Sequence, residues 1–122
     1  MKRSRIPGQK EQGLKDLNKA VIYAPDEPIF WANLGGAYGM IGDYKNSIYV
    51  LRKGLDVSPE SGQLSTNLAL SYINMKDYKE AVSILESLSN KERKENNEVV
   101  RLLKLARKGL QGQADGSAIT SE

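Results

Sequence analysis

The chain of 122 residues contains no cysteine and no histidine. Without cysteine, disulfide bonds and thiolate chemistry are excluded. Without histidine, the commonest general base and metal ligand is missing, so a nucleophile–base pair would need serine with lysine or aspartate, or two carboxylates. We find no such constellation. The sequence therefore predicts no enzyme, no catalytic residue, no metal and no cofactor.

Long apolar runs and a strong charge excess are also absent. No run approaches the roughly 20 apolar residues of a membrane span, and the basic start at residues 1–5 is not followed by the apolar core of a signal peptide. The net charge of +3 is mild, and aromatic residues do not alternate with the basic ones as in single-strand binders. We expect a cytoplasmic protein with no nucleic-acid partner and no membrane insertion. For a fragment of a longer protein, these expectations cover the fragment only.

What the sequence does contain is an internal repeat. A shift of 34 residues aligns residues 33–38 with residues 67–72, and residues 43–45 with residues 77–79. The aligned positions match in type: aromatic on aromatic, small on small, and aspartate on aspartate in a turn. A period of this length is typical of stacked supersecondary units.

Each unit reads as two helices and a tight turn. Apolar residues recur at three and four residues over 28–41 and again over 44–58, with a break at Gly42-Asp43. The same pattern predicts helices over 62–75 and 78–88. We interpret Asp43 and Asp77 as helix caps and not as catalytic acids, because each stands in a turn directly before a helix.

At these residues the chain resembles the tetratricopeptide repeat family, whose pattern is W-x2-L-G-x2-Y, then A-x3-F, then P. The first copy is complete apart from two substitutions, whereas the second departs at the tryptophan and the proline. The first copy reads Trp31, Leu34, Gly35, Tyr38, Ser47, Leu51 and Pro59; the second reads Ser65, Leu68, Ala69, Tyr72, Ala81, Leu85 and Arg93. The resemblance implies an all-α superhelical solenoid.

The predicted organisation is a half repeat, two full repeats and a capping helix. We expect a flexible N-terminus over 1–9 and a helical repeat domain over 10–110, followed by a disordered tail over 111–122. Within the domain, the half repeat covers 10–27, the repeats cover 28–61 and 62–95, and the capping helix covers 96–110. Asn96 or Asn97 should cap that last helix.

The family resemblance also implies a concave groove that is lined by the first helix of each unit. Asn33 and Asn67 stand where family members often bond the backbone of a bound peptide, and the last helix has Arg101 there. The carboxylate clamp of some members is not expected, since Ala32, Gly36 and Asn97 replace its key residues. The predicted groove consists of Ile29, Ala32, Asn33, Gly36, Gly39, Met40, Gln63, Thr66, Asn67, Leu70, Asn74, Arg101 and Lys104.

Two functions remain open from the sequence. The first is a non-catalytic interaction module that holds a peptide or helix of a partner protein, acidic in character, in this groove. The alternative is structural self-association as a weak homodimer. It would use the apolar face of the half repeat, which is formed by Leu14, Leu17, Val21 and Ile22.

Overall fold

The computed structural model describes residues 9–88 and 94–120, with side chains described for 11–88 and 94–114. This part of the chain contains helices and no strand. The helices are α1 (Gln9–Tyr23), α2 (Pro28–Met40), α3 (Tyr44–Val57), α4 (Gly62–Asn74), α5 (Tyr78–Glu86) and α7 (Asn97–Thr120). None of them is long and apolar enough to cross a membrane. The predicted all-α class is confirmed.

The helix starts are set by side-chain caps. Asp43 accepts from the backbone N–H of Asn46 at 3.3 Å, and Asp77 from that of Glu80 at 3.5 Å. Asn96 accepts from two backbone N–H groups at the start of α7, at 3.0 and 3.3 Å. Each cap gives a partner to N–H groups that the first helical turn leaves free. The capping role predicted for the two aspartates is therefore confirmed.

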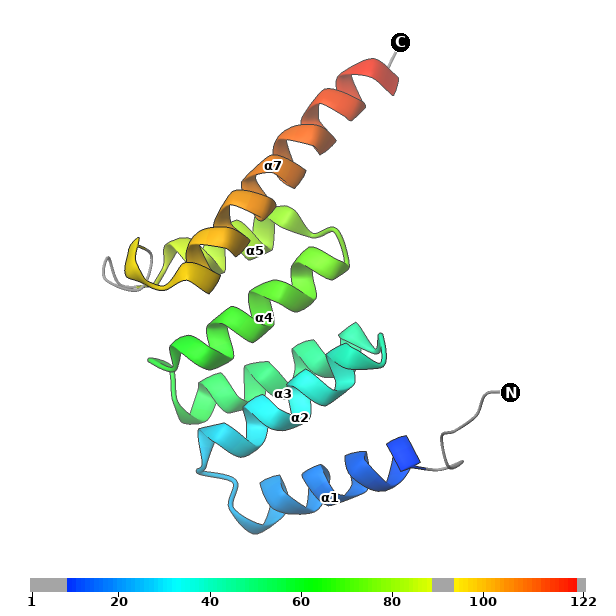
Figure 1. The fold of residues 1–122 in the computed structure, drawn as a ribbon, viewed down its shortest axis with the longest axis vertical. Helices are drawn as coiled ribbons and strands as arrows, with labels where there is room; N and C mark the ends of the chain where they lie inside the picture. The colour runs from blue at the N-terminus through cyan, green and yellow to red at the C-terminus, as the bar shows by residue number, and fades with distance from the viewer. Residues whose placement is uncertain (1–8, 89–93, 121–122) are drawn as a thin grey trace.

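The helices lie side by side and stack in chain order (Figure 1). Each helix packs on the next, from α1 on α2 to α5 on α7. In addition, α2 packs on α4 and α4 on α7. The first helices of the successive units therefore lie side by side and form one surface of the stack.

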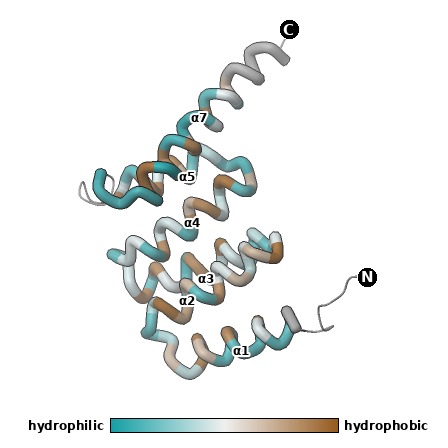
Figure 2. The backbone as a smooth tube through the Cα atoms, viewed as in Figure 1, coloured by the Kyte–Doolittle hydropathy of each residue, from teal (hydrophilic) through white to brown (hydrophobic). Residues whose placement is uncertain are grey.

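The core runs through the stack as three apolar clusters. Figure 2 shows hydrophobic segments recurring from α1 to α7. The first cluster joins α1, α2 and α3, the second joins α2, α3 and α4, and the third joins α4, α5 and α7. Their buried members are Val21, Leu34 and Val50; Ala32, Leu51, Leu64 and Leu68; and Ala69, Ile73, Ala81, Leu85, Val99, Leu102, Leu103 and Ala106. Each cluster needs two units, which is how a repeat stack derives its stability from neighbouring units.

Small residues permit close helix approach, as the repeat pattern predicts. A Cβ placed on Gly35 would collide with the side chain of Leu51, which is fully buried. A Cβ on Gly54 would lie 2.7 Å from Cβ of Trp31 and 2.9 Å from a methyl of Leu64. No real Cβ tolerates such distances, so α2, α3 and α4 pack closely only because these positions lack a side chain.

The prediction that helical structure ends near Gly109 is wrong, because α7 continues to Thr120. Gly109 does not terminate the helix; it lies against the ring of Tyr78, where a Cβ would clash. One turn further, the Gln113 amide donates to the backbone oxygen of Lys76 at 2.7 Å. These contacts with Tyr78 and with the turn before α5 explain why α7 continues past the glycine that predicted its end. Residues 1–8 and 121–122 of the predicted flexible ends lie outside the described residues, as does Arg93.

Candidate functional site

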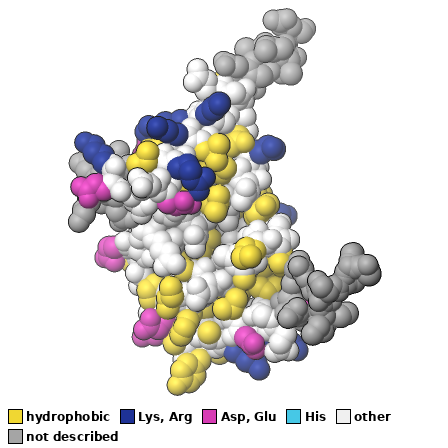
Figure 3. Space-filling view, in the orientation of Figure 1, with side chains coloured by type: hydrophobic (Ala, Val, Ile, Leu, Met, Phe, Trp, Pro, Cys, Tyr) yellow, Lys and Arg dark blue, Asp and Glu magenta, His cyan; other side chains and the backbone are white. Residues whose placement is uncertain are grey.

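The candidate site lies on the surface formed by α2, α4 and α7, where the described residues form two pockets. In Figure 1, α2 crosses in front of α3 and α7 in front of α5, so the view looks onto this surface. In the same orientation, hydrophobic side chains gather over the lower and central part, and Lys and Arg side chains gather around α7 (Figure 3). This is the face on which the resemblance placed the groove.

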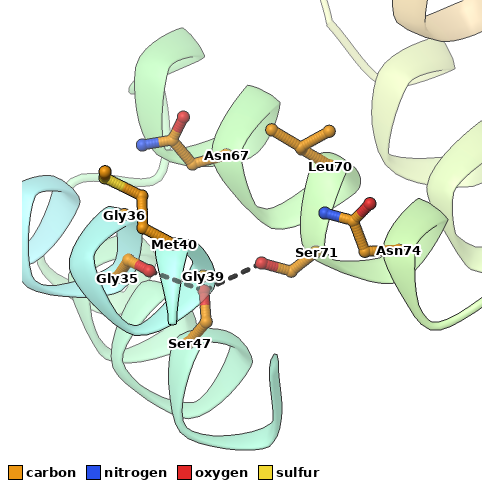
Figure 4. A pocket seen from close by; sticks show the side chains of 9 residues that line it. All are labelled: Gly35, Gly36, Gly39, Met40, Ser47, Asn67, Leu70, Ser71 and Asn74. Carbon is orange, nitrogen blue, oxygen red and sulfur yellow. Dashed lines mark hydrogen bonds between the residues drawn. The ribbon is translucent and has the colours of Figure 1, made fainter. Parts of the chain in front are cut away.

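A pocket opens between α2 and α4; we call it the central pocket (Figure 4). Its cavity volume is about 150 Å³. Its floor is buried and its rim is exposed: Met40 is 90% and Leu70 37% accessible, whereas Ser47 is 1% and Ser71 4% accessible. The lining residues are Gly35, Gly36, Gly39, Met40, Ser47, Asn67, Leu70, Ser71 and Asn74.

The glycines create this pocket. A Cβ on Gly36 would meet no atom within 4 Å, and one on Gly39 would meet only the Ser47 hydroxyl, at 3.7 Å. Ordinary side chains would therefore fit at both positions and would fill the space. A bulky apolar element therefore has room over these two glycines.

The floor of the pocket is formed by two serine hydroxyl groups, and the direction of their hydrogen bonds can be assigned. Ser47 Oγ donates to the backbone oxygen of Gly35 at 2.7 Å, because a carbonyl can only accept. Ser47 and Ser71 also share a hydrogen bond of 2.8 Å. Since Ser47 has only one hydroxyl proton, Ser71 is the donor in that second bond. The Ser71 oxygen is left as an acceptor at the bottom of the pocket.

A second pocket lies between the start of α4 and the start of α7; we call it the α7-end pocket. Its cavity volume is about 290 Å³, and its lining residues are Gly62, Gln63, Thr66, Asn67, Asn96 and Glu98. Asn67 lines both pockets. The two pockets therefore meet the face of α4 on either side of this residue.

The basic side chains near the groove are partly neutralised. Arg101 pairs with Glu98 at 2.9 Å, and Arg107 pairs with Glu86 at 2.6 Å. Lys104 and Lys108 are exposed, and within the described part of the chain neither has an ion-pair partner. The cationic end of the groove thus rests on these two lysines more than on Arg101.

Eight of the thirteen predicted groove residues line one of the two pockets, and five line neither. Gly36, Gly39, Met40, Leu70 and Asn74 line the central pocket, Gln63 and Thr66 line the α7-end pocket, and Asn67 lines both. Counting Asn67 with these, eight predicted residues face the groove, and Ile29, Asn33, Arg101 and Lys104 are exposed but line neither pocket.

Ala32 was assigned to the groove, and that assignment is wrong. Its side chain is 2% accessible and packs with Leu51, Leu64 and Leu68. The physical reason is the crossing of α2 and α4, which covers this part of α2. A residue at this position supports the stack and cannot contact a ligand.

Sequence reasoning missed the two serines at the floor and the two residues from the start of α7. Ser47 was assigned to a small packing position because it aligns with Ala81. The signal was its hydroxyl, since a buried serine needs a hydrogen-bond partner. Asn96 and Glu98 were assigned only to the helix start, yet both line the α7-end pocket.

The described side chains offer nothing that would hold a metal: no group of three or more Asp and Glu residues lies within reach of one ion in residues 11–88 and 94–114. The two pockets present amides, hydroxyls, apolar side chains and the carboxylate of Glu98. These are groups that bind a ligand, and none is paired as nucleophile and base.

Fold and groove together define a helical-repeat solenoid in which the first helix of each unit lines a shared groove. A family model for the tetratricopeptide repeat matches residues 41–106, which is more than half of the chain. The chain therefore belongs to the tetratricopeptide repeat family.

Solved structures of the same fold accompany this match. The TPR2B domain of yeast Sti1, in its complex with pHsp70, has a TM-score of 0.73 at 19% identity, over 83% of this chain and 85% of that chain. The Sgt2 TPR domain from Aspergillus fumigatus has 0.75 at 20% identity, over 89% and 73%. A double mutant of MamA RS-1 has 0.74 at 24% identity, over 89% and 61%. At these identities the likeness concerns the fold. No curated protein matches the chain.

Proposed function

We propose that this chain is a non-catalytic interaction module that binds a segment of a partner protein in the groove of α2, α4 and α7. The observation that carries the proposal is the pair of pockets on the face of α4, which share Asn67 as a lining residue. Concave sites with a few placed polar groups are the usual binding sites.

The amides of the groove favour an extended segment over a helix. Asn67 and Asn74 are seven residues apart on α4, or about 10 Å along its axis. Three residues of an extended chain cover about the same distance. An extended chain presents free N–H and C=O groups that a primary amide can bond, whereas a helix satisfies these groups internally.

The charge around α7 favours acidic residues at that end of the segment. Lys104 and Lys108 are exposed there, and surface cations raise the association rate of acidic partners. Yeast Sti1 domains of this fold bind pHsp70 and pHSP90. In this chain, Ala32, Gly36 and Asn97 replace the clamp residues of such domains, so we propose a different ligand.

The test uses a display library of random linear peptides, panned against the whole chain. Asn67→Ala combined with Arg101→Ala should weaken the selected peptides by about 1–3 kcal/mol, the range for lost hydrogen bonds to charged or buried groups. Unfolding should change little, because both side chains are partly or fully exposed. Selected peptides that bind the double variant as tightly as the parent would contradict the proposal.

Self-association through α1 is a second candidate, supported by one surface. Glu11, Leu14, Lys15, Asn18, Lys19 and Ile22 surround an open hollow on α1, and Ile22 is 77% accessible. Leu17 and Val21 pack on the neighbouring helices, and Leu14, which is half-buried, contributes to both surfaces. Exposed apolar residues on one helix face are typical of an interface.

Light scattering across a concentration series tests this candidate. We expect the apparent mass to rise at high micromolar concentration, and Leu14→Lys to abolish the rise because it places a charge in the contact. A parent chain that keeps the monomer mass throughout would contradict self-association and would leave the groove proposal unaffected.

A further inference from the structure

The central pocket has an acceptor at its floor, an apolar rim and a volume of about 150 Å³. The floor acceptor is Ser71 Oγ. Ser71 is 4% accessible to solvent, and its hydroxyl proton is donated to Ser47 Oγ. The rim consists of Met40 and Leu70, both exposed. Figure 4 shows Leu70 between Asn67 and Asn74 along α4, with Ser71 beside Ser47 beneath them.

We propose that this pocket receives the side chain of a tyrosine from an extended segment of a partner protein. The inference rests on the proposed function and adds the identity of the anchoring residue. Met40 and Leu70 contact the ring, and the open backbone of Gly36 lets the ring approach α2. The hydroxyl, at the far end of the ring, donates to Ser71 Oγ.

Each property of the pocket selects for tyrosine over other residues. A leucine or phenylalanine would lack the hydroxyl that donates to Ser71 Oγ and would therefore forgo this hydrogen bond. A lysine would bring a charge between two apolar side chains. Methionine at the rim adapts its shape to an aromatic ring and makes favourable sulfur contacts with it. On both sides, the amides of Asn67 and Asn74 bond the backbone of the segment. Within the described part of the chain, neither amide has another partner.

The first test fills the pocket. Gly36→Leu places a side chain where a Cβ meets nothing within 4 Å, so the fold should persist, as circular dichroism and unfolding curves verify. Peptides selected from the random library on the parent chain should share one tyrosine and should lose binding to Gly36→Leu by about tenfold or more, as for a buried anchor. Gly13→Leu is the matched control, because Gly13 is also a helical glycine with open space, but it lies on α1.

The second test addresses the hydroxyl. In the best peptide, replacing its tyrosine by phenylalanine should weaken binding to the parent by about fivefold, the value of one net hydrogen bond. With Ser71→Ala, the two peptides should bind equally. Ser71→Ala leaves the bond from Ser47 to Gly35 in place, so no buried donor is orphaned.

The outcomes separate this inference from the proposed function. If selected peptides lack a common tyrosine, or bind Gly36→Leu as well as the parent, while Asn67→Ala with Arg101→Ala weakens them, the tyrosine inference is overturned and the groove function stands. If the library yields no binder, or only binders that ignore both sets of variants, both proposals are overturned.

Discussion

Two adjacent glycines of α2 lie in opposite surroundings. Gly35 faces Leu51 so closely that any side chain would collide with it, whereas Gly36 faces open space in the groove. Both carry the same cost in a helix, about 1 kcal/mol relative to alanine. Packing explains that cost at Gly35, whereas no packing contact explains it at Gly36, where we propose that the open space receives a ligand.

The pair of substitutions Gly35→Ala and Gly36→Ala tests this difference at the residue scale. Gly35→Ala should lower the free energy of unfolding by about 1–3 kcal/mol through overpacking. Gly36→Ala should raise it by up to about 1 kcal/mol through better helix propensity. Urea unfolding of both variants measures the two changes, and changes of the same sign would contradict the assigned register of α2.

Leu51 is the residue on which α2, α3 and α4 converge, and it is fully buried. Leu51→Ala should cost roughly 2–5 kcal/mol, from lost burial and the cavity that remains. Met40→Ala, at 90% accessibility, should stay within about 0.5 kcal/mol and serves as the control. Thermal unfolding compares the two; an unchanged melting temperature for Leu51→Ala would contradict its place in the core.

At the residue scale, the repeat pattern predicted packing positions better than site positions. Gly35, Leu51 and Leu85 lie where the pattern places them, because the close approach of two helices restricts each position to one size. The groove assignment of Ala32 was wrong because the way α2 packs on α4 decides which side chains of α2 are buried. The apolar pattern within one helix carries no information about that packing. The role of Ser47 depends on Ser71, a contact between different units.

The two turns between paired helices share one backbone geometry. Gly42 has φ 84° and Lys76 has φ 64°. The backbone N–H groups of the aspartates that follow them donate to the backbone oxygens of Tyr38 and Tyr72, at 2.9 and 2.8 Å. These bonds end α2 and α4 in the same way. The turn after α4 therefore holds a lysine in a conformation that glycine adopts without strain.

Exchanging these two residues tests the turn at the scale of the element. Lys76→Gly should raise the free energy of unfolding by up to about 1 kcal/mol, because a left-handed conformation costs an L residue about 1–2 kcal/mol and glycine loses part of that gain to chain entropy. Gly42→Lys should have the opposite sign. Thermal unfolding decides, and a destabilised Lys76→Gly variant would show that the lysine side chain has a role of its own there.

Element boundaries were predictable wherever a local signal marks them. Proline, turn glycine and capping aspartate locate the ends of α2, α3 and α4 to within a residue or two. The end of α7 was not predictable, since Gly109 looks like a stop signal but packs against Tyr78. Only the position of α5 reveals the role of this glycine: without a side chain at Gly109, α7 can lie directly against Tyr78 of α5.

At the scale of the whole molecule, stacking places the first helices of all units on one face. The period of the repeat predicted the stack of units, and the family resemblance predicted eight of the residues that line the two pockets. The balance of charge was not predictable, because the ion pair of Arg101 with Glu98 and that of Arg107 with Glu86 depend on side-chain positions. The groove consequently presents less positive charge than its composition indicates.

The measurement that tests the groove most directly is a map of backbone amide chemical shifts in the ¹⁵N-labelled chain, titrated with the tightest peptide from the library. Binding in the groove predicts that the shifts concentrate on α2, α4 and the start of α7, with the largest near Gly36, Asn67 and Leu70. The convex residues of α3 and α5, such as Tyr49, which is 60% accessible, should stay unchanged. Shifts that concentrate on α3 and α5 instead, with none at Asn67, would contradict the account.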